Sequence, residues 1–328
     1  MPTLAESRAN APGRQDAPPS RTWPRIKRVL TWVFFGLVTW LLVSQARSVE
    51  WGEVWASVQA LPASALALGA GLALLSHLLY SSFDLIGRHV TGHPLRTGQV
   101  MLITFISYAF NLNLGALVGG FAFRYRLYSR LGLDNPTITR VLTLSMLTNW
   151  LGYFVLGGAV FLFQPLALPP DWKIGSVGLQ GLGAALLAVA GAWLAACAFS
   201  PRRTWTVRGH EIALPSMRLA LLQLVMSCTN WMLISGAVFM LLEQRIAYPA
   251  VLSVLLIAAV AGVITHVPAG LGVLEAVFVA LLSHQVPKGE LLGALLAYRA
   301  VYYLGPLLLA TVAYLLVEAR AKALRAGA

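Results

Sequence analysis

The residues with the clearest chemical potential lie between positions 265 and 278, where the sequence reads THVPAGLGVLEAVF. Pro268, Gly270 and Gly272 fall within five residues, and these residue types interrupt a straight α-helix. Glu275 follows one turn later, among apolar residues. A carboxylate in an apolar membrane segment is costly without a partner, and it therefore indicates a functional site. A simple kink, with Glu275 satisfied by a neighbouring helix, is the structural alternative.

Arg299 is the cation expected to pair with Glu275. At the helical rise of 1.5 Å per residue, each of the two lies roughly 13–15 Å from an end of its own apolar run. The pair would either open when a phosphate competes for Arg299 or serve only to fix the helix register. Tyr298 is included as a binding candidate, although aromatic residues beside such a site more often serve in packing.

Further candidates are polar residues within or beside other apolar runs. Asn149 and Asn230 each stand in a Thr-Asn-Trp triplet at mid-depth of a run, where they face a cavity or form an interhelical hydrogen bond. Asp84 and Arg88 have the i,i+4 spacing of a boundary ion pair. His77 is expected to be simply hydrogen-bonded rather than to relay protons, and the same holds for His266.

The composition decides the class of protein that must position these residues. Of the 328 residues, 58% are hydrophobic and 11% are charged, with a mean hydropathy of +0.73. Soluble domains carry about 25% charged residues, so we expect an all-α polytopic membrane protein. The net charge of +12 then reflects orientation in the bilayer and not nucleic-acid binding. Both cysteines lie within apolar runs and indicate neither a disulfide nor a metal site.

The chain divides into a membrane domain and two tails. Residues 1–28 predict a disordered basic cytoplasmic tail, 29–320 the membrane domain, and 321–328 a short basic tail. A signal peptide is the rival interpretation of the first apolar run, but the leader is long and favours a retained helix. Six full spans are expected: 29–43, 61–83, 138–163, 174–199, 219–242 and 291–317.

Two segments do not fit a single span, and both are expected to be broken hairpins. Residues 97–123 are too long for one span and too short for two, and they are polar in their second half. Residues 249–284 contain the Pro/Gly break, and two short spans there would give the same charge parity. With both as re-entrant hairpins, 19 Lys and Arg fall inside and 4 outside, with both termini cytoplasmic. The two hairpins then enter from opposite sides, as in an inverted repeat.

Two sequence blocks carry a resemblance to a known family. They are NLNLGALVGGFAFRYRLYSR at 111–130 and PAGLGVLE at 268–275. The chain resembles the transmembrane region of the lysylphosphatidylglycerol synthase/flippases, specifically a stand-alone bacterial inner-membrane branch. The second block is similar to the family pattern Pro-Gly-Gly-Leu-Gly-x-x-Glu, with Ala269 in place of one Gly. The likeness covers about residues 29–320.

The resemblance implies movement of a phospholipid between leaflets of the bacterial inner membrane, and a lipid-linked intermediate is the other substrate class that we expect. The soluble aminoacyl-transferring domain of the larger relatives is not expected here, and no catalytic pattern appears, so we expect no enzyme, cofactor or metal. The expected ligand is a phospholipid with an anionic head group, and nucleic acid is not expected. The expected binding residues are Pro268, Gly270, Gly272, Glu275, Arg299, Tyr298, Asn113, Arg124, Arg126, Asn149 and Asn230.

Two other functions remain open on the sequence. One is a non-transporting membrane partner of a lipid synthase or glycosyltransferase. The other is an ion-coupled transporter of a small solute, for which Asp84, Glu275 and the histidines would be coupling sites.

Overall fold

The structure is a computed structural model. It describes residues 51–164, 166, 175–201, 204–207, 210–265, 267 and 270–326, and everything below concerns these residues. The chain forms two units, 1–47 and 48–328, and the described residues belong to the second. The predicted span at 29–43 and the N-terminal tail therefore lie outside the described residues, as do Pro268 and His266.

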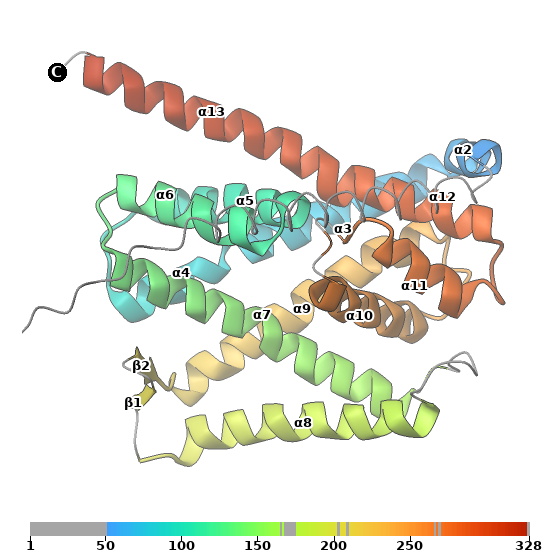
Figure 1. Ribbon diagram of the computed structural model, residues 1–328, viewed down its shortest axis with the longest axis horizontal. Helices are drawn as coiled ribbons and strands as arrows, with labels where there is room; N and C mark the ends of the chain where they lie inside the picture. Colours follow the sequence, from blue (N-terminus) through green and yellow to red (C-terminus); the bar gives the residue numbers. More distant parts are fainter. Residues whose placement is uncertain are drawn as a thin grey trace, which may run out of the picture. The chain divides into compact units, whose positions relative to one another are not determined.

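The fold is all-α and polytopic, as expected (Figure 1). Six helices are long and apolar enough to cross a membrane: Ala63–Thr91, Asn135–Phe163, Ser176–Phe199, Met217–Leu241, Tyr248–Thr265 and Lys288–Ala319. Four of them match predicted spans within three residues, and Ala63–Thr91 runs eight residues beyond the end of the predicted span 61–83. The sixth, Tyr248–Thr265, was expected as one leg of a broken hairpin, and it has the length of a full span.

The first half of the described chain contains α2 to α6. Their bounds are α2 Trp51–Ala60, α3 Ala63–Ser81, α4 Phe83–Thr91, α5 Thr97–Leu114 and α6 Phe123–Arg130. A π-helical segment, η1 (Ala116–Ala122), joins α5 to α6 after Gly115, whose φ is 83°. The chain then folds back, because η1 and α6 both pack on α5 (Figure 1).

The backbone at Gly119 comes very close to α5. A Cβ at Gly119 would lie 2.0 Å from the backbone nitrogen of Asn111, which no side chain permits. The sequence block that carries the family resemblance therefore forms a tight helical hairpin, and glycine is required where its two legs meet.

The second half contains α7 to α13. Their bounds are α7 Asn135–Phe163, α8 Ser176–Phe199, α9 Met217–Leu241, α10 Tyr248–Thr265, α11 Val273–Leu282, α12 Lys288–Tyr298 and α13 Gly305–Ala326. A second π-helical segment, η3 (Arg299–Leu304), connects α12 to α13, so these three form one long rod (Figure 1). Helix α11 packs beside α10 as a second hairpin.

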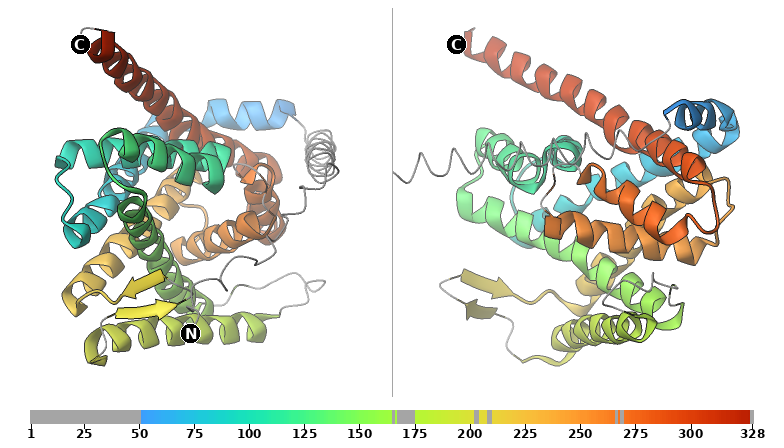
Figure 2. Two further views of the ribbon diagram at one scale, coloured as in Figure 1. Left: turned by 60° about the vertical axis from the view of Figure 1, so that its left-hand side comes forward. Right: turned by 45° about the vertical axis from the view of Figure 1, so that its right-hand side comes forward.

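Residues expected as a short polar loop between α8 and α9 contain an antiparallel ribbon. Strands β1 (Thr204–Val207) and β2 (His210–Ala213) pair with Thr204 opposite Ala213 (Figure 2). The largest buried cluster lies where α9, α10, α11 and α12 meet, around Phe278, Tyr298 and Tyr302. This cluster holds the broken hairpin against the rod that carries Arg299.

Candidate functional site

The site begins at the break between α10 and α11. Helix α10 ends at Thr265, and Gly270 and Gly272 both adopt left-handed backbone, with φ of 54° and 76°. Because Gly lacks Cβ, this conformation is open to it at little cost. Gly272 is the N-cap of α11, which begins at Val273. The sequence thus predicts both the break and the new helix N-terminus correctly.

Glu275 and Arg299 form the expected ion pair across this break. The Arg299 Nε donates to Glu275 Oε1, and its Nη2 lies 3.0 Å from Oε2. The same Nη2 donates to the carbonyl oxygen of Gly270, also at 3.0 Å. The guanidinium therefore holds both the carboxylate and the backbone of the break. The side chains are 10% and 17% exposed for Arg299 and Glu275, so the pair is only partly buried.

Local helix electrostatics favour this arrangement. Glu275 lies in the first turn of α11, where the positive end of the helix dipole stabilises an anion. Arg299 opens the π-helical segment η3, and its guanidinium carbon lies 5.3 Å from the centre of the Tyr303 ring. Single π-helical turns often mark functional sites. A helix N-terminus together with a guanidinium can bind an anionic group such as a phosphate.

Two predicted binding residues, Asn113 and Tyr298, make contacts within the protein close to Arg299 and η3. The side-chain amide of Asn113 donates to the carbonyl oxygens of Ala109, at 2.8 Å, and Tyr303, at 3.3 Å. It thus ties α5 to η3. Tyr298 is buried, and its ring stacks on that of Tyr302 with 5.2 Å between centroids. Both residues support the site: Tyr298 is fully buried, and Asn113 is partly buried.

The second buried ion pair corrects two expectations. Asp84 does not pair with Arg88, which donates instead to Thr97 Oγ1 at 2.8 Å. Asp84 is fully buried and accepts from Arg124 Nε at 3.1 Å and from the Tyr128 hydroxyl at 2.9 Å. Arg124 was expected to bind the anionic head group. It is buried because α6 turns it inward against α4.

The first hairpin also places Arg126 apart from the site. Its side chain is exposed and pairs with Glu318 of α13 at 3.0 Å. The hydrogen bonds of Asn149 likewise do not involve the break between α10 and α11. Its carbonyl oxygen, and not its side chain, accepts from Ser227 Oγ and Trp231 Nε1, which joins α7 to α9.

A buried hydrogen-bond network lies between the helices and was only partly predicted. Ser76 Oγ donates to Asn230 Oδ1 and also contacts the Tyr302 hydroxyl, each at 2.8 Å. The hydroxyls of Tyr302 and Tyr108 lie 2.9 Å apart. His77 Nε2 lies 3.0 Å from the Tyr302 carbonyl oxygen, as a simply hydrogen-bonded histidine would.

Sequence reasoning selected Asn230 from this network and missed its partners. Ser76, Tyr108 and Tyr302 are residue types that occur throughout transmembrane helices, so no single one of them stands out. The network joins α3, α5, α9 and η3. Within the described part of the chain, no group of three or more metal-ligating residues gathers, and Cys197 is buried whereas Cys228 is half-buried.

Comparison with known proteins gives concordant matches. The family model described as "Lysylphosphatidylglycerol synthase TM region" matches residues 29–310. A protein of Escherichia coli (strain K12) named "Inner membrane protein YbhN" is 48% identical over 305 residues, which cover 93% of this chain and 96% of that protein. A Synechocystis protein named "Uncharacterized protein slr0712" is 29% identical over 292 residues, covering 87% and 90% respectively.

Proposed function

The chain belongs to the family of the lysylphosphatidylglycerol synthase transmembrane region, and from this premise we propose that it moves a phospholipid between the leaflets of a bacterial inner membrane. The single observation that carries the proposal is the Glu275–Arg299 pair at the helix break. The similarity to a protein named as an inner membrane protein supports the location. The proposal includes no catalytic step.

The break has the properties that a phosphate site within a membrane requires. A phosphodiester needs a fixed cation and N–H donors where water is scarce, and the start of α11 with Arg299 offers both. Glu275 neutralises Arg299 at rest and so avoids an unpaired charge. An arriving phosphate competes with Glu275 for the guanidinium and opens the pair.

Lipid must also reach the site from the side. Several large apolar residues around the break are exposed, as a lipid-facing surface requires, and these are Val263, Ile264, Leu271 and Leu304. In our proposal the two hairpins, α5–η1–α6 and α10–α11, are re-entrant and enter from opposite faces. The head group would pass between them while the acyl chains stay in the bilayer.

The test combines stability and lipid movement in one set of variants. Arg299→Ala and Glu275→Ala should each lower the free energy of unfolding by about 3–5 kcal/mol, because each leaves the other charge unpaired. The double replacement Glu275→Leu with Arg299→Met should restore much of that stability. It should not restore lipid movement in proteoliposomes, measured with a leaflet-specific assay, since no cation remains for phosphate.

The control is an exposed pair on another surface. Glu318→Gln, which removes the partner of Arg126 and Arg130, should change the unfolding free energy by roughly 0–1 kcal/mol and leave lipid movement intact. A double variant at 275 and 299 that is both stable and fully active would reduce the pair to a scaffold. Ion-driven uptake of a small solute by the native chain that is lost in Glu275→Ala, with no lipid movement in the native chain, would favour solute transport instead.

A further inference from the structure

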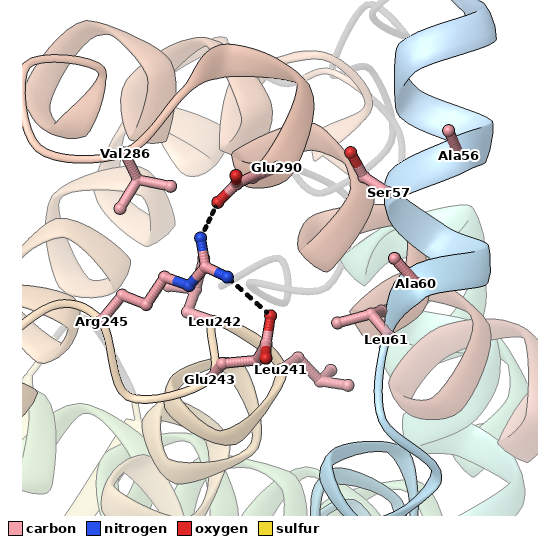
Figure 3. Close-up of a pocket in the computed structure, with 10 residues that line it drawn as sticks. All are labelled: Ala56, Ser57, Ala60, Leu61, Leu241, Leu242, Glu243, Arg245, Val286 and Glu290. Carbon is pink, nitrogen blue, oxygen red and sulfur yellow. Dashed lines mark hydrogen bonds and ion pairs between the residues drawn. The ribbon is translucent and has the colours of Figure 1, made fainter.

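A pocket of about 290 Å³ opens where α2 meets the end of α9 and the start of α12 (Figure 3). Several lining residues are apolar or small: Ala56, Ser57 and Ala60 of α2 with Leu61 directly after it, and Leu241 at the end of α9 with Leu242 directly after it. The charged wall of the pocket consists of Glu243, Arg245 and Glu290. Neither Glu275 nor Arg299 lines this pocket.

The three charged side chains alternate in sign. The Arg245 guanidinium lies between the two carboxylates, with Nη1 donating to Glu290 and Nη2 lying 3.4 Å from Glu243 Oε1 (Figure 3). Two carboxylates share a single guanidinium, so this wall carries one net negative charge. All three side chains are more than a third exposed, and a ligand in the pocket can therefore reach them.

The pocket wall is held in place by backbone contacts. Glu243 and Gln244 both adopt left-handed backbone, and the turn is fixed by a hydrogen bond from the Gln244 N–H to the Phe239 carbonyl oxygen at 3.1 Å. Helix α2 rests directly on α12, since a Cβ at Gly293 would lie 2.8 Å from Ser57 Cβ. The walls on both sides therefore belong to packed elements.

The position of the pocket along the helices restricts the class of ligand. Helix α9 ends at Leu241 and α12 begins at Lys288, so the charged wall lies where two apolar spans reach their ends. A ligand there contacts charges on one side and hydrocarbon on the other. It must therefore be amphipathic, with both a cationic and an anionic group to match the alternating wall.

We propose that this pocket binds the zwitterionic head group of an amine-bearing phospholipid. Its ammonium contacts the exposed carboxylates of Glu243 and Glu290 beside the guanidinium, and its phosphate contacts Arg245. An ammonium has three N–H donors for the two carboxylates, whereas a quaternary amine has none. The volume lies near the lower limit of small-ligand sites, which suits a head group with its chains outside. This inference names the substrate class for the proposed lipid movement, and the function of the pocket rests on that proposal. Binding of the lipid to the pocket can be measured without any transport.

Binding should be measured on the purified full chain in detergent by calorimetry. The ligands are dihexanoyl phosphatidylethanolamine, the phosphatidylglycerol and phosphatidylcholine of the same chain length, and O-phosphoethanolamine. We expect the ethanolamine lipid to bind about tenfold or more tightly than the other two lipids. O-Phosphoethanolamine should bind more weakly because it leaves the apolar wall unfilled. Equal or tighter binding of the free head group would overturn the assignment to a lipid.

Two kinds of variant separate the pocket from the fold. Glu290→Gln should weaken the ethanolamine lipid about tenfold while hardly changing phosphatidylglycerol. Ala60→Leu should fill the pocket and weaken every ligand without altering a charge. Glu318→Gln, on an exposed pair with α6, is the matched control and should leave affinity unchanged. Melting temperatures of the same samples identify any variant that has unfolded.

Unchanged affinity in both folded pocket variants, or equal affinity for phosphatidylglycerol and phosphatidylethanolamine in the native chain, would overturn the inference. Failure of the proposed transport is distinguishable. In that case Glu290→Gln would still lose binding in detergent, while the native chain would move no lipid in proteoliposomes.

Discussion

Arg124 and Arg126 show how burial decides what a charged residue contributes. They lie two positions apart in α6, and each pairs with a carboxylate. Arg124 is almost fully buried against Asp84, which has no exposed surface. Arg126 is 54% exposed, and its partner Glu318 lies at the surface end of α13. These two arginines on one short helix therefore allow a matched comparison of a buried and an exposed ion pair.

Replacing each arginine by Gln should give very different losses of stability. Arg124→Gln leaves Asp84 buried without its cation, and we expect a loss of about 3–5 kcal/mol. Arg126→Gln breaks a solvent-screened pair and should cost roughly 0–1 kcal/mol. Reversible denaturation in detergent measures both. Similar losses for the two variants would show that Asp84 does not depend on Arg124.

His93, in the segment between α4 and α5, gives the protein a predicted pH dependence. Both ring nitrogens are buried and lack a hydrogen-bond partner among the described residues. Burial lowers the pKa of His93, the positive charge of Arg88 lowers it further, and Asp84 opposes this. The neutral imidazole is therefore the form that the folded state favours, while the unfolded chain takes up a proton at about pH 6.5.

The sign of the effect follows from linkage. As pH falls below about 6.5, the unfolded state binds a proton that folded His93 resists, so stability falls. His93→Gln should remove this part of the dependence. We expect the stability difference between the variant and the native chain to change between pH 7.5 and 5.5 in favour of the variant. A constant difference across that range would contradict the pKa shift.

The two ion pairs also show what the sequence can and cannot predict about residues. Glu275 and Arg299 were paired correctly, because two lone charges at similar depth in adjacent runs have few alternatives. Asp84 was assigned to Arg88 by the local i,i+4 rule, and its real partner is Arg124, 40 positions away. The choice depends on how α6 packs on α4, and no local pattern carries that information.

At the scale of elements, the ends of helices were easier to predict from the sequence than the π-helical segments. Pro and Gly marked the end of α10 and the start of α11 within a few residues. The π-helical segments η1 and η3 were not predicted, since they arise from how the helix is packed. The second span was predicted to end at residue 83, next to the break at Ser82 between α3 and α4. The role of η3 is to turn Arg299 toward the break from within a helix that is otherwise apolar.

The left-handed backbone at Gly270 gives a test of the break itself. No atom of the described residues lies within 4 Å of a Cβ built at Gly270, so Gly270→Ala meets no steric clash there, and the positive φ is the unfavourable feature. We expect a loss of about 1–2 kcal/mol and a larger fractional loss of lipid movement. Gly181→Ala, in α8 with nothing within 4 Å, should be neutral or stabilising by up to about 1 kcal/mol.

Unfolding curves and the leaflet-specific assay on the two glycine variants test whether the backbone of the break serves function or only packing. Equal effects at 270 and 181 would return the Gly cluster to a role in packing. A loss of lipid movement at position 270 in a protein that stays folded would tie the backbone of the break to function.

At the scale of the molecule, hydrophobic periodicity and charge predicted most of the spans, because the bilayer imposes length and composition on each helix. The sequence boundaries of α7, α8 and α9 agree with the structure within three residues. What the sequence left open was whether residues 249–284 cross the membrane. The 18 residues of α10 are long enough to cross, whereas the 10 residues of α11 are short of a span.

Two sets of contacts show which helix ends lie on the same face of the protein. Arg126 and Arg130 of α6 bind Glu318 of α13, so these ends share one face. Arg245 binds Glu290, and Gly293 packs on Ser57, so the end of α9, the start of α12 and α2 share another. The positive-inside rule assigns these same groups to opposite sides, and it alone predicts that the first face is cytoplasmic.

Single-cysteine labelling tests this topology. Cys197 and Cys228 must first be replaced, so that neither native cysteine reacts with the reagent. Cysteines at positions 126, 245 and 288 are then treated in intact cells with a reagent that does not cross the inner membrane. We expect labelling at 245 and 288 and none at 126, because the charge bias places 19 basic residues inside against 4 outside. Labelling at 126 alone would show that the orientation of the whole protein is the reverse of the predicted one. The pocket beside Arg245 would then lie in the cytoplasmic leaflet. Labelling at 126 together with 245 would instead show that the first hairpin crosses, since these positions would then share a side.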